Sequence, residues 1–218
     1  MKKYKYLLGT SLLLGSFTAP LFAEEPKSLY LSIGGGVNFI SDIEGEFEGT
    51  TGAFETDNPF IYSIAIGKEF NDWRLEFNYS ASTVSSDSVK VTAGGNSTTA
   101  NITPDYEVGF SSYMLYAYKD IPGDSKFTPY FGAGLGVSSV EVNAETYSIL
   151  GSNVNISEAS ESVFTFGLKG GVGYEIAENT SLYSEASYLN YASFTTDVGE
   201  EMDSNNSFVI STGLRFSF

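Results

Sequence analysis

Six charged residues lie at polar positions of segments in which every second residue is apolar. They are Arg74, Glu76, Lys169, Glu175, Glu185 and Arg215. Their chemistry has two readings: they pair and fill an interior, or they line a narrow, gated path for ions. Because an isolated buried charge is costly, we expect the opposite charges to pair and hydrogen-bond as a structural polar plug. The ion path is kept as the alternative.

Catalytic chemistry has little support in this chain. The 218 residues include no histidine and no cysteine. A Ser-His or Asp-His general base is therefore impossible, and disulfides and thiolate zinc sites are excluded. No carboxylate pair is marked as an acid and a base. We expect no enzyme activity, no cofactor and no metal ion.

Acidic residues gather in two segments, 42–57 and 197–203. The first holds Asp42, Glu44, Glu46, Glu48, Glu55 and Asp57, and the last holds Asp197, Glu200, Glu201 and Asp203. Oxygen clusters suit Ca²⁺ or Mg²⁺, but no EF-hand spacing occurs. We interpret these segments as a solvated acidic surface, with weak cation binding as the alternative.

The apolar pattern has a period of two, which is typical of strands with one apolar face. It predicts eight strands, near 29–39, 60–67, 74–81, 107–119, 131–138, 164–176, 181–191 and 208–218. Short turns are expected at 71–72, 122–124 and 178–179, and long loops at about 41–58, 85–105, 142–160 and 193–206. The glycines at 34–36 and 132–136 lie within strands, so they are expected to make room for large neighbours and not to bind phosphate.

The N-terminal segment has the features of a cleaved secretory signal peptide. Lys2, Lys3 and Lys5 precede a short apolar run, and small residues follow up to Ala23. We expect cleavage there, which gives residues 1–23 as the signal and 24–218 as one barrel domain. Because three of the 11 Lys and Arg and none of the 27 Asp and Glu lie in that signal, the mature part carries 8 − 27 = −19. Such a charge repels nucleic acid and anionic lipid.

Strand number, loop lengths and aromatic content together predict an all-β protein, an eight-stranded antiparallel up-and-down transmembrane β-barrel in the outer membrane. A soluble sandwich or a lipocalin-like barrel is the alternative, but either would expose one face to water, and the apolar face is unsuited to that. With eight strands, both termini lie with the short turns in the periplasm. Trp73, Phe60 and Tyr130, with Phe218, are expected to form interfacial aromatic belts.

Two motifs resemble a known family. Residues 127–137, FTPYFGAGLGV, and 164–188, FTFGLKGGVGYEIAENTSLYSEASY, resemble strands of the OmpA-like and opacity-type superfamily of small outer-membrane barrels. The final strand, FVISTGLRFSF, resembles the signal that the outer-membrane assembly machinery reads, carried by Phe218, Phe216, Leu214 and Ile210. The family often has an arginine near Ser187, and this chain does not.

These observations favour a structural, adhesive or surface-interaction protein of the outer membrane. The second hypothesis is a small porin-like channel for ions or small solutes. The expected partners are outer-membrane lipid and, during biogenesis, the assembly machinery. No nucleic acid partner is expected, and the sequence does not identify an extracellular partner.

Overall fold

The computed structural model describes residues 29–41, 43–47, 50–54, 57–93, 96–142, 145–149, 152–156, 159–195 and 201–218. The expected signal peptide lies outside these residues. No helix among the residues described has the length and hydropathy that a membrane crossing requires. The regular elements in this part of the chain are all β-strands.

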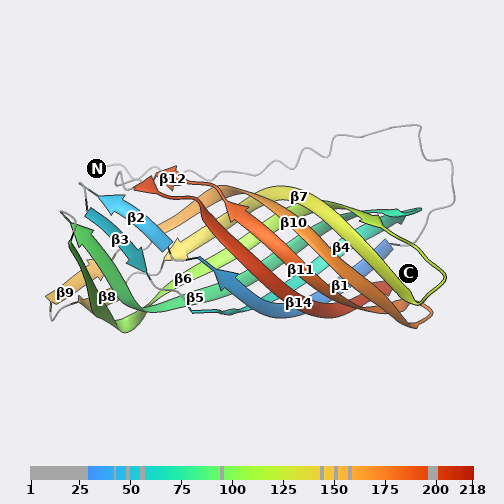
Figure 1. The fold of residues 1–218 in the computed structure, drawn as a ribbon, viewed down its shortest axis with the longest axis horizontal. Coiled ribbons are helices and arrows are strands. Elements are labelled where there is room, and N and C mark those ends of the chain that lie inside the picture. Colours follow the sequence, from blue (N-terminus) through green and yellow to red (C-terminus); the bar gives the residue numbers. More distant parts are fainter. Residues whose placement is uncertain are drawn as a thin grey trace, which may run out of the picture.

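Eight long strands form a closed antiparallel ring (Figure 1). They are β1 (Leu29–Ile40), β4 (Phe60–Phe70), β5 (Trp73–Ala93), β6 (Asn96–Asp120), β7 (Phe127–Val142), β10 (Ala159–Ala177), β11 (Thr180–Tyr191) and β14 (Asn205–Ser217). Each pairs with the next along the chain. β1 then pairs with β14, from Tyr30↔Ser217 to Ile40↔Ser207, and closes the ring. The predicted eight-stranded barrel is confirmed.

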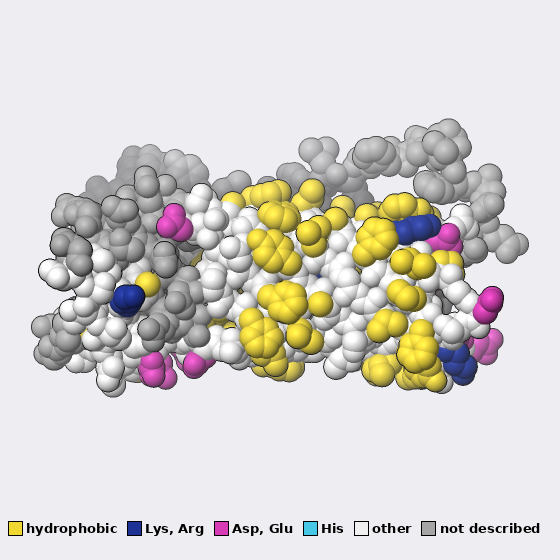
Figure 2. All heavy atoms as spheres, viewed as in Figure 1, with side chains coloured by type: hydrophobic (Ala, Val, Ile, Leu, Met, Phe, Trp, Pro, Cys, Tyr) yellow, Lys and Arg dark blue, Asp and Glu magenta, His cyan; other side chains and the backbone are white. Residues whose placement is uncertain are grey.

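The apolar face of each barrel strand points outward. In β1, Leu29, Leu31 and Ile33 are 46%, 37% and 46% exposed, whereas Tyr30 and Ser32 between them are buried. Figure 2 shows hydrophobic side chains gathered over the long strands, and the charged side chains on this face lie toward the two ends. A barrel that faces lipid has this distribution, because its apolar residues meet hydrocarbon and its polar residues face inward.

Strand β6, whose two faces are not separated by the sequence pattern alone, follows the same rule. Tyr113 and Leu115 are exposed, while Met114 and Tyr116 are each 1% exposed. The pairing explains this choice, since Leu115 lies opposite Phe77 of β5 and Leu135 of β7, which also face outward. The inward face of β6 is therefore unusually rich in large side chains.

At one end, short turns at 71–72, 121–126 and 178–179 join the strands, and we call this the short-turn end. At the other end, strands extend beyond the barrel. β5 and β6 stay paired as far as Ala93↔Asn96, with a register shift between Ser86 and Ser88. We call these paired extensions of β5 and β6 the ribbon. Six short strands pair with the ribbon or with one another: β2 (Ile43–Phe47), β3 (Thr50–Phe54), β8 (Glu145–Ile149), β9 (Ser152–Ile156), β12 (Phe194–Thr195) and β13 (Glu201–Met202). We call the whole assembly the outer sheet.

The outer sheet corrects the expectation of four long loops at 41–58, 85–105, 142–160 and 193–206. β3 pairs with the β5 extension and β8 with the β6 extension, so these segments contain strands. The reason lies in the ribbon, where Val89, Ala100 and Ile102 are at most 5% exposed and give it a buried apolar face of its own. Of the ten acidic side chains expected on this surface, Asp57 and Asp203 are described, and both are exposed. The other eight side chains lie outside the description.

Candidate functional site: the barrel interior

Strand alternation places a cluster of charged and tyrosine side chains inside the barrel at the short-turn end. In β5, Trp73, Leu75 and Phe77 face outward, and Arg74 and Glu76 between them are 1% and 4% exposed. Glu185 of β11 is 8% exposed. Charges this deep need partners, because desolvation is costly.

Arg74 has one carboxylate and several aromatic partners. Its Nε lies 2.9 Å from both oxygens of Asp120, at the end of β6. The guanidinium carbon lies 4.4 Å and 4.6 Å from the ring centres of Tyr118 and Tyr130. Neither Nη atom has a hydrogen-bond partner among the described residues, so ring faces surround this part of the cation.

Glu76 and Glu185 act as hydrogen-bond acceptors. Tyr30 Oη donates to Glu76 Oε2 at 2.9 Å, and Tyr118 Oη donates to Oε1 at 3.0 Å. Tyr130 Oη donates to Glu185 Oε2 at 3.1 Å. Glu76 therefore holds two phenols, from β1 and β6, and Glu185 holds one, from β7, so the contacts connect neighbouring and next-nearest strands across the interior.

Lys169 completes the cluster from β10. Its Nζ lies 3.0 Å from Glu185 Oε1 and 4.4 Å from the ring centre of Tyr116. Ser187 Oγ also donates to Glu185 Oε1, at 3.3 Å. The family position near Ser187, where an arginine is often found, thus holds a hydroxyl that supports the Lys169–Glu185 pair.

The remaining two expected plug residues, Arg215 and Glu175, differ in position: the first lies against interior tyrosines and the second does not. Arg215 is half-buried, with its guanidinium carbon 5.0 Å from the ring centre of Tyr30, 5.7 Å from that of Tyr130 and 5.8 Å from that of Tyr183. Glu175 departs from the expectation, because its side chain is exposed. It lies at the end of β10 beside a register shift between Glu175 and Ala177, where the barrel wall ends.

The tyrosines of this cluster were not among the expected plug residues, and one of them lies elsewhere than expected. Tyr130 was expected in an interfacial belt, but it is 4% exposed and faces the interior. The alternation in β7 carries this information, since Phe131 faces outward and its neighbours Tyr130 and Gly132 must face inward. Trp73 and Phe60, by contrast, are 54% and 66% exposed on the outer face. Asp120 was also missed, because it ends a strand next to a turn.

Glycines opposite the tyrosines leave space for their rings. A Cβ placed on Gly132 would overlap the Tyr118 ring, and one on Gly67 would overlap the ring of Tyr30. A Cβ on Gly171 would lie 2.7 Å from Tyr130. The expected role of glycine within strands, making room for large neighbours, is confirmed at these positions.

A second layer fills the interior farther from the short-turn end. Along β6 the inward side chains run from Tyr118 and Tyr116 to Ser112 and then to Phe110 and Val108. Ser112 and Thr165 are both hydrogen-bonded to Ser138, each at 2.7 Å. Beyond them lies an apolar layer of buried side chains: Ile40, Ile61, Val84, Val108, Phe110, Val163, Leu189, Tyr191 and Val209.

A small cavity of about 30 Å³ lies within this interior. Its lining includes Asn78, Ser80, Lys169, Glu185 and Ser187. This volume corresponds to one or two water molecules, and a polar lining of this kind suits water. The residues of the interior can therefore pair, hydrogen-bond and exclude solutes, and their carboxylates are occupied by phenols and cations.

The expected assembly residues lie on the outer face of the last strand. Phe218, Ile210 and Phe216 are 69%, 54% and 37% exposed, and Leu214 is half-buried. They share one face of β14 because alternate residues of a strand point the same way. Their recognition by an assembly machinery stays a prediction.

We predict that Asp120→Ala destabilises the barrel by about 3–5 kcal/mol, because it leaves the buried Arg74 without its carboxylate. The free energy of unfolding in urea, measured in detergent micelles, checks this. The double variant Arg74→Met/Asp120→Leu should cost less than Asp120→Ala, since it removes both charges. An exposed control, Asp124→Ala, should change little. A double variant as unstable as the single one would show that Arg74 does not need its partner.

We also predict that Gly132→Ala lowers the free energy of unfolding by about 1–3 kcal/mol, since the added methyl overlaps the Tyr118 ring. Gly170→Ala is the matched control, because a Cβ there meets only the Tyr130 carbonyl oxygen at 4.0 Å. Equal stability of the two variants would contradict the inward packing of Tyr118.

The family model described as outer membrane protein beta-barrel domain matches residues 9–216. Outer membrane protein PagN of Salmonella typhimurium strain LT2 is 27% identical over 143 residues, which are 62% of this chain and 59% of that protein. The chain therefore spans about three fifths of that relative's length.

Solved structures share the fold. The crystal structure of Neisserial surface protein A has a TM-score of 0.58 and 18% identity, over 89% of this chain and all of that one. The outer membrane protease OmpT from Escherichia coli has a TM-score of 0.57 and 9% identity, over 91% and 99%. OprG from Pseudomonas aeruginosa has a TM-score of 0.50 and 16% identity, over 89% and 97%. At these identities the likeness is one of fold.

Proposed function

Because the chain belongs to the outer membrane protein beta-barrel domain family, and so is a protein of the outer membrane, we propose that it is a non-catalytic barrel that interacts with partners through its outer sheet. The short turns then lie in the periplasm and the outer sheet outside the cell. The signal peptide at 1–23 is part of this proposal, since export requires one.

The observation that carries the proposal is the filled interior. Arg74, Glu76, Lys169 and Glu185, with their tyrosines, occupy the short-turn end, and the apolar layer around Phe110 and Tyr191 occupies the other. An eight-stranded barrel has an interior that side chains can fill. With side chains at both levels, we expect a solute to have no continuous path, and the outer sheet is then the part left for function.

The outer sheet has the properties of an interaction surface. Its ribbon has a buried face, with Val89 5% and Ile102 3% exposed, so its shape is held by packing. Its opposite face presents exposed polar side chains, among them Asp87, Lys90, Asn101 and Thr103. A pre-formed surface binds partners with a smaller ordering cost than mobile loops do.

The channel alternative rests on the small polar cavity next to Lys169 and Glu185. We predict that the refolded mature protein gives no steady conductance steps in a planar bilayer. Arg74→Ala should also be silent, since the apolar layer still closes the interior. Phe110→Ala/Tyr191→Ala should be silent too, because the polar plug remains. Steady steps from the unaltered protein would favour the channel instead.

The surface role has its own test. We predict that a non-adherent laboratory Gram-negative strain displaying this chain gains adherence to cultured epithelial cells, and that replacing residues 86–103 by an Asn-Gly turn removes it. The ribbon carries the pairings of β3 and β8, so its removal disrupts the outer sheet. Heat-dependent gel mobility must show that the shortened barrel still folds. Full adherence by a folded, shortened barrel would overturn the proposal.

A further inference from the structure

Lipid-facing charges differ between the two ends of the barrel. At the short-turn end, the charged residues at outward positions of the described barrel strands are Lys68 of β4 and Lys119 of β6. At the other end, the outward positions of β6 and β7 hold Glu107 and Glu141, both exposed. The carboxylates at the short-turn end lie in turns or face the interior, except that of Glu175, which is exposed beside the register shift at the end of β10. At the outward barrel positions that the structure describes, ammonium groups therefore line the membrane edge at the short-turn end and carboxylates line it at the other end.

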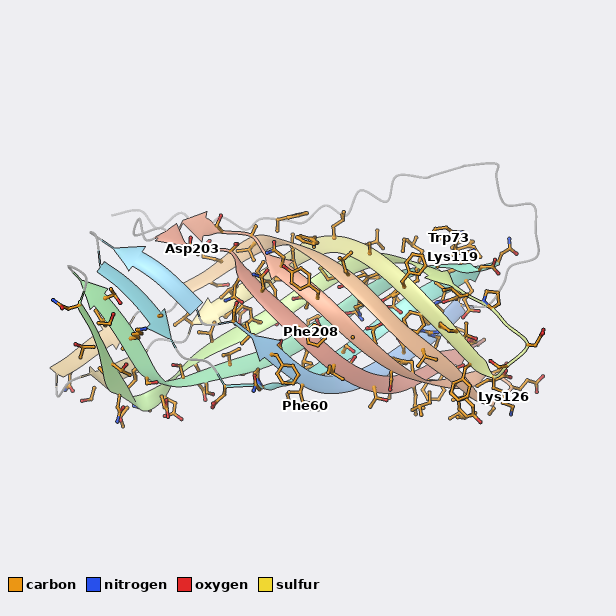
Figure 3. The ribbon with its side chains drawn as sticks, viewed as in Figure 1. Phe60, Trp73, Lys119, Lys126, Asp203 and Phe208 are labelled. Atoms are coloured by element: carbon orange, nitrogen blue, oxygen red, sulfur yellow. The ribbon has the colours of Figure 1, made fainter. Side chains whose placement is uncertain are left out.

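The two lysines flank an aromatic pair. Phe70 pairs with Trp73, and Trp73 pairs with Lys119, so the three lie in one row across β4, β5 and β6. Lys119 Nζ lies 5.3 Å from the Trp73 ring centre, and Lys68 Nζ lies 5.2 Å from that of Phe70. Figure 3 shows Trp73 and Lys119 side by side at the short-turn end. We call Lys68, Phe70, Trp73 and Lys119 the lysine–aromatic site.

We propose that the lysine–aromatic site binds the phosphate of an anionic phospholipid headgroup. Trp73 is 54% exposed at the edge of the apolar surface, where indole rings occupy the headgroup level of a bilayer. Lysine binds phosphate as a point charge. Lys68 and Lys119 lie on the two strands that flank β5, two strand spacings or about 10 Å apart across the sheet, and their long side chains let both ammonium groups reach one phosphate. Leu75, opposite Lys68, provides an apolar surface for the acyl chain.

Asp72 sets the charge of the site and hence the class of lipid. Its Oδ2 lies 3.1 Å from Lys119 Nζ, and its side chain is 49% exposed against 31% for Lys119. Because Asp72 lies in the 71–72 turn, beyond the ends of β4 and β5, it is on the water side of the row. Two ammonium groups and one carboxylate leave one positive charge, which favours a lipid of net charge −1, such as phosphatidylglycerol, over zwitterionic phosphatidylcholine.

The acidic chain as a whole repels anionic lipid, with a net charge of −16. That repulsion is screened over a Debye length of about 8 Å at physiological salt, whereas the lysines are in contact with the headgroup. A basic residue near a charged membrane surface contributes about 1 kcal/mol, which corresponds to about fivefold enrichment of anionic lipid per lysine. The local site therefore outweighs the distant acidic residues.

Trp73 is the single tryptophan of the chain, so tryptophan fluorescence, excited at a wavelength that tyrosine does not absorb, reports on this site alone. The refolded mature protein is placed in phosphatidylcholine vesicles with an equal mole fraction of brominated phosphatidylglycerol or brominated phosphatidylcholine. We expect stronger quenching of Trp73 by the brominated phosphatidylglycerol. Lys68→Gln/Lys119→Gln should bring the two lipids to equal quenching, and Asp72→Asn should increase the preference.

Lys126→Gln is the matched control, because Lys126 is exposed in the 121–126 turn of the same end and away from Trp73 (Figure 3). It should keep the preference. Equal quenching by the two lipids in the unaltered protein, or an unchanged preference in the double variant, would overturn the proposal. Loss of the preference on adding glycerol phosphate would overturn it too, since the site would then recognise free phosphate. None of these readouts depends on the outer sheet or on conductance.

Discussion

Closure of the strand ring is the constraint on which the rest of this structure depends. In hydrocarbon every backbone N–H and C=O must find a partner within the protein, so a sheet that crosses a membrane cannot keep an open edge. The β1–β14 pairing meets this condition over eleven consecutive residue pairs. Once the ring is closed at eight strands, the interior is too narrow for bulk water, and side chains have to fill it.

The contents of the interior follow from that narrow width. Tyrosine rings fill it from some strands, and glycines on the facing strands leave them room, as Tyr118 and Gly132 do. The phenol groups then need acceptors, which Glu76 and Glu185 supply, and the carboxylates are balanced by the cations beside them. The charged residues, the tyrosines and the glycines of the interior therefore depend on one another for packing and hydrogen bonding. Under the proposed function, the same packing leaves the outer sheet as the surface on which partners act.

Strand number, pairing order and outward faces could be predicted because lipid imposes a strict period of two. The buried positions of Arg74 and Glu76 follow from the same period. The contacts of Arg74 with the rings of Tyr118 and Tyr130 could not be predicted, because they depend on the registers of several strands. Tyr130 was expected in the interfacial belt because it is aromatic. Its position two residues from the inward-facing Gly132 places it on the inward face of β7. The β5–β6 ribbon was taken for a loop because its serines and threonines concealed the buried apolar positions Val89, Ala100 and Ile102.

Amide hydrogen exchange at the β1–β14 seam tests the closed ring most directly. This seam joins the first and last strands of the barrel, β1 at residues 29–40 and β14 at residues 205–217, and no turn connects them directly. Protection from exchange reports the free energy of opening each hydrogen bond. A closed barrel predicts that backbone amides near Ile33 and Leu214 are protected as strongly as those of β7 and β10. Fast exchange confined to β1 and β14, with the other strands protected, would show an open sheet and contradict this account.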